Sequence, residues 1–197
     1  MKNKWTTMVL LCTAFILSAS ASFDVPGLAR IPNSKASIML DGKLETGEWD
    51  KALKLRVNDS LDLYFQQDAA NLYLCLANPY GQPTLMGVDF YLEADDKRLV
   101  NLHASAKLGE RRLKGQDYGD WNWWNNRLWY ANVVRFGNDT GPRFLFDEAK
   151  EFQIRKGLIK GKKFKLMLEI SYPPYRSTTY PKDASPVNSE KWLVLSL

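Results

Sequence analysis

Residues Tyr118–Tyr130 form the segment whose residue types are best suited to binding chemistry. Four of the seven tryptophans of the protein lie here, interleaved with asparagine, aspartate and arginine. A polar ligand with apolar faces, such as a sugar ring, needs flat aromatic surfaces for stacking and nearby amide or carboxylate groups for directed hydrogen bonds. Core packing is the alternative interpretation, because tryptophan buries a large area and usually stabilises the protein interior.

The segment divides into two parts. Arg127–Val134 has the alternation typical of a strand, so we expect Trp129 to lie in the core. The earlier tryptophans follow a glycine and an aspartate and precede two asparagines, which indicates a loop or a strand end. We therefore predict a ligand-binding surface made of Trp121, Trp123, Trp124, Tyr118, Asp120 and Asn122, with further hydrogen bonds from Asp117 and Asn125.

Residues that carry enzymatic chemistry in other proteins do not form a recognisable motif. His103 is the only histidine, which excludes a His-rich zinc site, and no G-x-S-x-G motif supports Ser-His-Asp chemistry. We interpret His103 as a surface or hydrogen-bonded residue. Asp89 with Glu93, or Asp117 with Asp120, would be the carboxylate pairs for glycoside hydrolysis, but acidic residues at this density occur on any surface. The sequence predicts a non-catalytic protein.

The first 21 residues have the organisation of a secretory signal peptide. Lys2 and Lys4 provide a positive start, Thr6–Leu17 is an apolar run, and Ala19–Ala21 is a small-residue cleavage site. The run is shorter than the ~20 residues of a membrane-spanning helix, although an uncleaved anchor is the alternative. We expect export to the periplasm or the cell exterior and no transmembrane segment after cleavage.

The net charge limits the classes of partner, and the cysteine content limits the disulfides that can form. Loss of Lys2 and Lys4 lowers the 27 basic residues to 25 against 22 acidic ones, a net charge of +3. This excess is too small to indicate nucleic acid or an anionic membrane as a partner. Only Cys75 remains after cleavage, so no intramolecular disulfide can form, and its apolar neighbours indicate a buried, inert thiol.

The remaining sequence predicts an all-β domain. Leu61–Gln66 and Asn71–Ala77 alternate around a turn as a hairpin does, and Met86–Leu92 with Leu99–Ala106 forms a second strand pair. In Lys163–Ile170 the even-numbered apolar residues are expected to face inward. At most one or two short helical turns are expected, one of them within Thr46–Leu53. Short strands at regular spacing indicate an antiparallel β-sandwich.

Three further expectations concern boundaries and edges. Residues 22–36 are expected to form an extended leader and 37–197 a single sandwich domain, whose first strand is Ile38–Leu40. Trp49 is expected to pack against the strands, because it shares one helical face with Ala52 and Leu53. Lys107–Lys114 is expected to be a solvated strand edge or loop face.

A family resemblance is visible at the start of this domain. Ile38–Leu44, followed by Glu48, Trp49 and Ala52, resembles the opening of family 9 carbohydrate-binding modules and of the related DOMON-like sugar- or haem-binding sandwiches. Asn71–Leu74 and Val88–Glu93 resemble later strands of the same families, and the similarity weakens after about residue 106. The resemblance implies an antiparallel immunoglobulin-like or jelly-roll-like sandwich that binds sugars or, in one branch, haem.

By this resemblance, the tryptophans of the 118–130 segment would stack on a poly- or oligosaccharide, either alone or within a complex with a partner enzyme or the cell envelope. The alternatives are a haem-binding electron carrier, with His103 and either Met86 or Met167 as axial ligands, and a structural or interaction module of the envelope. Sandwich modules of this kind often carry structural calcium, for which Asp41, Glu45 and Asp50 are the conceivable ligands.

Overall fold

The computed structural model describes residues 28–35, 37–78, 87–124, 128–133, 135–137, 143–145, 148–172 and 176–197. The predicted signal peptide, Met86 and Asn125 lie outside these ranges. Within the described ranges, no helix combines the length and the apolar character needed to cross a bilayer.

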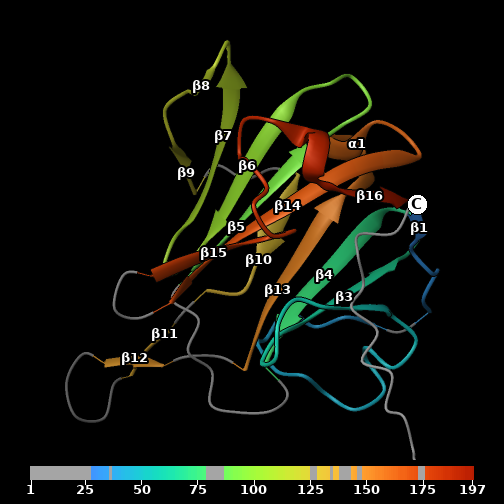
Figure 1. Ribbon diagram of the computed structural model, residues 1–197. Coiled ribbons are helices and arrows are strands. Elements are labelled where there is room, and N and C mark those ends of the chain that lie inside the picture. Colours follow the sequence, from blue (N-terminus) through green and yellow to red (C-terminus); the bar gives the residue numbers. More distant parts are fainter. Residues whose placement is uncertain are drawn as a thin grey trace, which may run out of the picture.

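Two β-sheets face each other in a sandwich-like arrangement (Figure 1). The nine-stranded sheet contains, in spatial order, β1 (Ala29–Arg30), β16 (Leu193–Ser196), β14 (Lys163–Tyr172), β5 (Gly87–Glu93), β6 (Leu99–Ala104), β7 (Leu108–Lys114) and β8 (Asp117–Tyr118), while β15 (Arg176–Tyr180) pairs with β14 and β9 (Asn122–Trp123) pairs with β7. The five-stranded sheet contains β10 (Trp129–Ala131), β13 (Ala149–Arg155), β4 (Asn71–Ala77), β3 (Asp62–Gln67) and β2 (Leu53–Arg56).

The described helical residues are few. They form α1 (Lys156–Ile159) and the single 3-10 turn η1 (Ser189–Lys191), and a small hairpin joins β11 (Arg135–Gly137) to β12 (Arg143–Leu145). Strand pairing is antiparallel except between β1 and β16. The predicted all-β antiparallel sandwich with one or two short helical turns is therefore confirmed.

Apolar side chains from the facing sheets make the core. Phe90 of β5 meets Phe152 of β13 edge to face, with ring centroids 4.2 Å apart. Trp129 is buried and stacks on Phe152 at 6.0 Å, as predicted for the second half of the aromatic segment. All four even-numbered apolar residues of β14 from Phe164 to Ile170 are buried in this cluster, which confirms the alternation read from the sequence.

The opposite, outer face of the nine-stranded sheet is partly covered by the segment 181–192. Trp192, Ala184, Met167, Leu99 and Tyr91 form a separate apolar cluster there. The Trp192 indole N–H donates to the Ser185 carbonyl at 2.8 Å, and this bond fixes the segment in a turn above the strands. One half of the outer face is thereby closed to solvent.

The N-terminal residues take part in the sandwich. Ala29 and Arg30 pair with the last strand, and the amide N–H of Ile31 donates to the Ser196 carbonyl at 2.8 Å. Ile31 is fully buried in the main core. Residues 29–31 of the expected leader thus contribute a strand and a core side chain.

Three local predictions differ from the structure. The expected strand at Ile38–Leu40 is wrong, because residues 37–40 join neither sheet and the Met39 amide instead donates to the Glu48 carboxylate at 2.6 Å. The expected helical turn near Thr46 is a run of turns that ends where β2 begins at Leu53. Lys107–Lys114 is not an open edge, since β7 pairs with β6 on one side and with β8 and β9 on the other.

Glu151 of β13 fastens the 41–52 segment to the five-stranded sheet. Its carboxylate accepts hydrogen bonds from the Gly42 amide at 2.8 Å and from the Trp49 indole N–H at 3.3 Å. Trp49 is buried beside Tyr64 and Cys75, so its predicted role as a packing anchor and the buried state of Cys75 are both confirmed. Burial raises the pKa of Glu151 to about 7, assisted by the negative charges of Glu48 and Asp41.

This buried carboxyl predicts a pH-dependent stability. Between its ordinary pKa of 4.5 and about 7, folded Glu151 holds a proton that the unfolded chain releases, so stability falls as the pH rises through this window. We expect the free energy of unfolding, measured by urea denaturation, to drop by about 2–3 kcal/mol from pH 5 to pH 8. The pKa of Glu48 is also raised by burial, so Glu151→Gln should reduce the slope without abolishing it.

Glu190→Gln is the matched control, because that carboxylate is exposed. Equal slopes in Glu151→Gln and in the wild-type protein would contradict the assignment.

Candidate functional site

A row of residues, most of them polar or aromatic, crosses the part of the outer face that the 181–192 segment leaves uncovered. Facing residues of six neighbouring strands make up this row: Thr179 (β15), Glu169 (β14), Asp89 (β5), His103 (β6), Gly109 (β7) and Trp123 (β9). Along the central strands the sequence neighbours of these residues, such as Phe90 and Leu108, enter the core, so the row faces away from it. Trp123 belongs to the same face because its ring packs over Gly109. We call this set the outer-face row.

Asp89 and His103 form the centre of the row. The Nδ1 atom of His103 lies 3.1 Å from both carboxylate oxygens of Asp89, and its Nε2 lies 2.9 Å from the Ser105 hydroxyl. The Asn101 amide donates a further hydrogen bond to Asp89 at 3.0 Å, and Arg111 Nε donates to Asn101 at 2.8 Å. His103 is thus the hydrogen-bonded residue expected from the sequence, held within a polar network that spans β5, β6 and β7.

Trp121 and Trp123 fold back over β7 and stack on each other. Their ring centroids are 4.9 Å apart and their planes differ by 24°. A methyl group on Gly109 would lie only 2.6 Å from Trp123 and 3.1 Å from Trp121, so the absence of a side chain at Gly109 makes this position accessible to the indoles. Both rings also meet the His103 imidazole edge on, at centroid distances of 5.5 and 5.8 Å.

Cationic side chains extend this aromatic pair into a stack. The Arg111 guanidinium lies 4.2 Å from the centroid of Trp121 and 4.9 Å from that of Tyr118, and Lys107 Nζ lies 5.2 Å from Trp123. Such cation–π contacts contribute about 0.5–2 kcal/mol each, more where the cation is shielded from water. Trp121 therefore contacts both the Trp123 ring and the Arg111 guanidinium, and these contacts fix the position of the Trp123 ring.

Trp123 and Trp124 are the exposed tryptophans of the predicted surface, with 40% and 56% of their areas accessible. Trp124 has a φ angle of 58°, in the left-handed region, and its amide donates to the Leu108 carbonyl at 2.9 Å. A bulky residue in this conformation costs on the order of 1–2 kcal/mol, and such strain concentrates at functional sites. The backbone thus holds an apolar ring in water at an energetic cost.

The other predicted site residues lie beside these tryptophans or flank them. Tyr118 is half-buried, and its hydroxyl donates to the Pro186 carbonyl at 2.8 Å, which links β8 to the 181–192 segment. Burial raises its pKa. Asp117, Asp120 and Asn122 are exposed, the last on β9 directly before Trp123. Sequence reasoning placed all of these residues on one surface, and the structure places Asn122, Trp121 and Trp123 against or beside β7.

The carboxylates considered for glycoside hydrolysis have separate partners. Asp89 binds His103 and Asn101, whereas Glu93 accepts hydrogen bonds from Lys97 at 3.1 Å and from the Ser189 hydroxyl. Those bonds and the Lys97 and Lys165 charges lower the pKa of Glu93 against the opposing effect of burial. Glu169, which sequence reasoning missed, accepts a hydrogen bond from the Tyr91 hydroxyl at 3.1 Å in the outer-face row.

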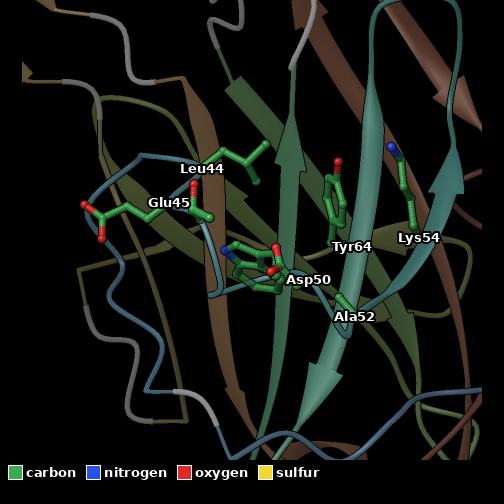
Figure 2. A pocket seen from close by; sticks show the side chains of 8 residues that line it. Leu44, Glu45, Asp50, Ala52, Lys54 and Tyr64 are labelled. Atoms are coloured by element: carbon green, nitrogen blue, oxygen red, sulfur yellow. The ribbon is translucent and has the colours of Figure 1, made fainter.

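A pocket of about 320 Å³ lies elsewhere, where the 41–52 segment meets β2 and β3 (Figure 2). Leu44 and Glu45 come from the segment, and Lys54 and Tyr64 from the adjacent strands. Its aromatic lining consists of Trp49 and Tyr64, which are buried and whose ring centroids are 6.3 Å apart. These rings serve docking of the segment, and none of the predicted ligand-binding residues lines the pocket.

Of the residues considered as haem ligands, His103 and Met167 have other partners in the structure, and Met86 lies outside the described residues. Both ring nitrogens of His103 are already hydrogen-bonded, and Met167 is fully buried in the cluster under Trp192. Asp41 and Asp50, considered for calcium, accept backbone hydrogen bonds from Lys43 and Gly47. Among the described residues, no three histidine, cysteine, aspartate or glutamate side chains are grouped closely enough to hold a metal ion.

Comparisons of the chain with protein-family models, with curated proteins and with solved structures gave no match. The site must therefore be interpreted from its own geometry.

Four contributors were missed by sequence reasoning as members of a site: Ser105, Arg111, Glu169 and Asp89 in its pairing with His103. A signal for the last was partly present: the sequence indicates a hairpin here, and once Glu93 pairs with Leu99 across the 94–98 turn, residues 89 and 103 lie opposite each other. Strand alternation would place Ser105 on the same face as His103, and although β6 ends at Ala104 its hydroxyl does reach the His103 ring. Arg111 and Glu169 depend on the pairing of β7 and β14 with that hairpin.

The close packing of Trp121 and Trp123 on Gly109 leads to a prediction. Gly109→Ala should push the stacked indoles off β7 and cost about 1–3 kcal/mol of folding stability, as overpacking usually does. Near-UV circular dichroism should show weaker coupling between the tryptophans. Gly157→Ala in α1 is the control, since an added methyl there meets nothing within 4 Å. A Gly109→Ala protein with unchanged spectrum and stability would contradict the described packing.

Proposed function

We propose that the protein is an exported carbohydrate-binding domain that holds a poly- or oligosaccharide on the outer face of its nine-stranded sheet. The observation that carries this proposal is the pair of exposed rings, Trp123 and Trp124, at one end of a row of hydrogen-bonding side chains. Sugar rings combine apolar faces with equatorial hydroxyls, so they suit a surface that supplies both kinds of contact.

The two tryptophans have the properties of a binding surface more than those of a core. Their exposure leaves apolar area in water that a stacked ligand would cover. The strained backbone at Trp124 costs stability without adding a core contact, which is expected where function fixes a side chain. Trp121 stacks on Trp123, and Arg111 lies over Trp121 in turn, so that the Trp123 ring is held in one orientation before the ligand arrives.

Polar groups near the rings supply directed contacts. Asn122 and Asp120 are exposed on either side of Trp121, and Asp89 and Glu169 continue the row across β5 and β14. Carboxylate and amide oxygens accept hydrogen bonds from sugar hydroxyls, and amide N–H groups donate to them. The arrangement favours a neutral, hydroxyl-rich ligand that spans several strands.

Binding should depend on the exposed rings. We expect Trp123→Ala and Trp124→Gly each to weaken affinity for the bound polysaccharide about tenfold or more, because each removes a stacking surface worth at least 1.4 kcal/mol. Trp124→Gly is chosen because glycine tolerates the left-handed backbone and should keep the fold intact. Glycan arrays identify the ligand and isothermal titration calorimetry measures the affinity.

The control for loss of an exposed aromatic ring is Tyr130→Ala. Tyr130 is 52% exposed but lies on β10 of the other sheet, so its removal should leave affinity unchanged. Failure to bind any plant, algal or bacterial polysaccharide in these assays would overturn the proposal.

Export makes a separate prediction. The full chain expressed in a bacterial host with a secretion pathway should yield a mature protein whose N-terminus is Ser22, directly after the Ala19–Ala21 site. Intact mass spectrometry of the periplasmic and extracellular fractions measures this. A protein that keeps Met1 and stays in the cytoplasm would count against export.

A further inference from the structure

The polar centre of the outer-face row contains a hydrogen-bonded Asp–His–Ser chain. Asp89 lies on β5 and His103 faces it on β6, while Ser105 is the first residue of the bend that follows β6 and lies against the His103 ring. A carboxylate only accepts hydrogen bonds, so the His103 Nδ1 that lies 3.1 Å from both Asp89 oxygens carries the hydrogen. In the neutral ring, Nε2 is then an acceptor, and the Ser105 hydroxyl 2.9 Å away donates to it.

This direction of the two hydrogen bonds, from serine to histidine and from histidine to aspartate, is the one that activates a serine nucleophile. The carboxylate fixes the imidazole tautomer and orientation, and the imidazole accepts the hydroxyl proton as the oxygen attacks a carbonyl carbon. The chain is recognised by geometry rather than by motif, since the same arrangement occurs on unrelated folds with different sequence orders. Asp89 and His103 are only 15% and 22% exposed at their side chains, so water competes weakly for their hydrogen bond.

Gly87 keeps the side of Ser105 that faces β5 free of a side chain. Gly87 lies next to Ser105 across the strand pair, and a methyl group there would come within 3.2 Å of Ser105 Cβ and 3.6 Å of the His103 ring. A side chain at position 87 would therefore press on Ser105 and His103, and glycine avoids this contact. On the next strand, Ser171 faces Gly87 and keeps this part of the outer face lined by small residues.

One backbone donor lies close enough to assist the reaction. The amide N–H of Lys107 donates to Ser105 Oγ at 3.4 Å, so one backbone donor stands beside the atom that would attack, where it could turn to the developing negative charge. The Ser105 amide is committed to the Lys107 carbonyl at 2.9 Å and is not available for this task. With a single donor we expect slow turnover and a preference for activated esters.

We propose that Ser105, His103 and Asp89 form a nucleophilic site that hydrolyses acyl esters. Ser105 Oγ attacks the ester carbonyl, its proton passes to His103 Nε2 and then to the departing alkoxide, which leaves as the alcohol. Water then attacks the acyl-serine, gives its proton to His103 and releases the carboxylic acid with Ser105 restored. We take O-acylated sugars as the natural substrates. This choice of substrate rests on the proposed function, whereas the ester chemistry does not.

The test uses the mature chain with probes that contain no sugar. A fluorophosphonate should add covalently to one residue, identified as Ser105 by intact mass and peptide mapping, and 4-nitrophenyl acetate should be hydrolysed catalytically. Ser105→Ala and His103→Gln should each lower kcat/KM about 100-fold or more, as loss of a nucleophile or general base does. Ser60→Ala is the control, because that serine lies in an exposed turn before β3 and should leave the rate unchanged.

The outcomes separate the two proposals. Wild-type protein that takes up no fluorophosphonate, or Ser105→Ala that hydrolyses 4-nitrophenyl acetate as fast as the wild type, overturns the nucleophilic site and leaves carbohydrate binding untouched. Specific labelling of Ser105 in a protein that binds no polysaccharide retains the esterase site and overturns only the choice of sugar esters. Because labelling is measured on the wild-type chain, a variant that fails to fold does not decide the result.

Discussion

Burial of one face of the nine-stranded sheet against the five-stranded sheet is the constraint on which the rest of the structure depends. The contact between Phe90 and Phe152 lies within this buried layer. Because side chains alternate along a strand, each core residue of β5 or β6 directs its neighbours to the opposite face. Asp89 and His103 therefore lie outside the core because Phe90 and its neighbours lie inside it.

The outer face is divided between two coverings with different properties. The 181–192 segment buries Trp192 and Met167 and closes its half as a second small core. On the other half, Trp121 and Trp123 lie over Gly109, but Trp123 and Trp124 keep large exposed areas. A sheet face that is covered only by a short aromatic stack retains polar groups near its surface, and this is where binding or chemistry can take place.

The sequence predicted much of the fold because the relevant signals are local. The hairpin of β3 and β4, the alternation of β14 and the burial of Trp129 all follow from apolar periodicity within a few residues. The prediction of a strand at Ile38–Leu40 was wrong because a short apolar run does not reveal whether a partner strand is present. In the structure Glu48 supplies the hydrogen-bond acceptor that a neighbouring strand would have provided. Glu151, more than one hundred residues later, anchors the same segment.

For the site, the sequence by itself determined the residue types: aromatic rings among amides and carboxylates, one histidine, and a two-residue spacing from His103 to Ser105. Only the tertiary structure decided which of them meet. The register of β5 with β6 aligns Asp89 with His103, and the pairing of β9 with β7 places Trp123 over Gly109. Such pairings are set by the competition of all strands for buried area and hydrogen bonds, and a single segment does not encode that competition.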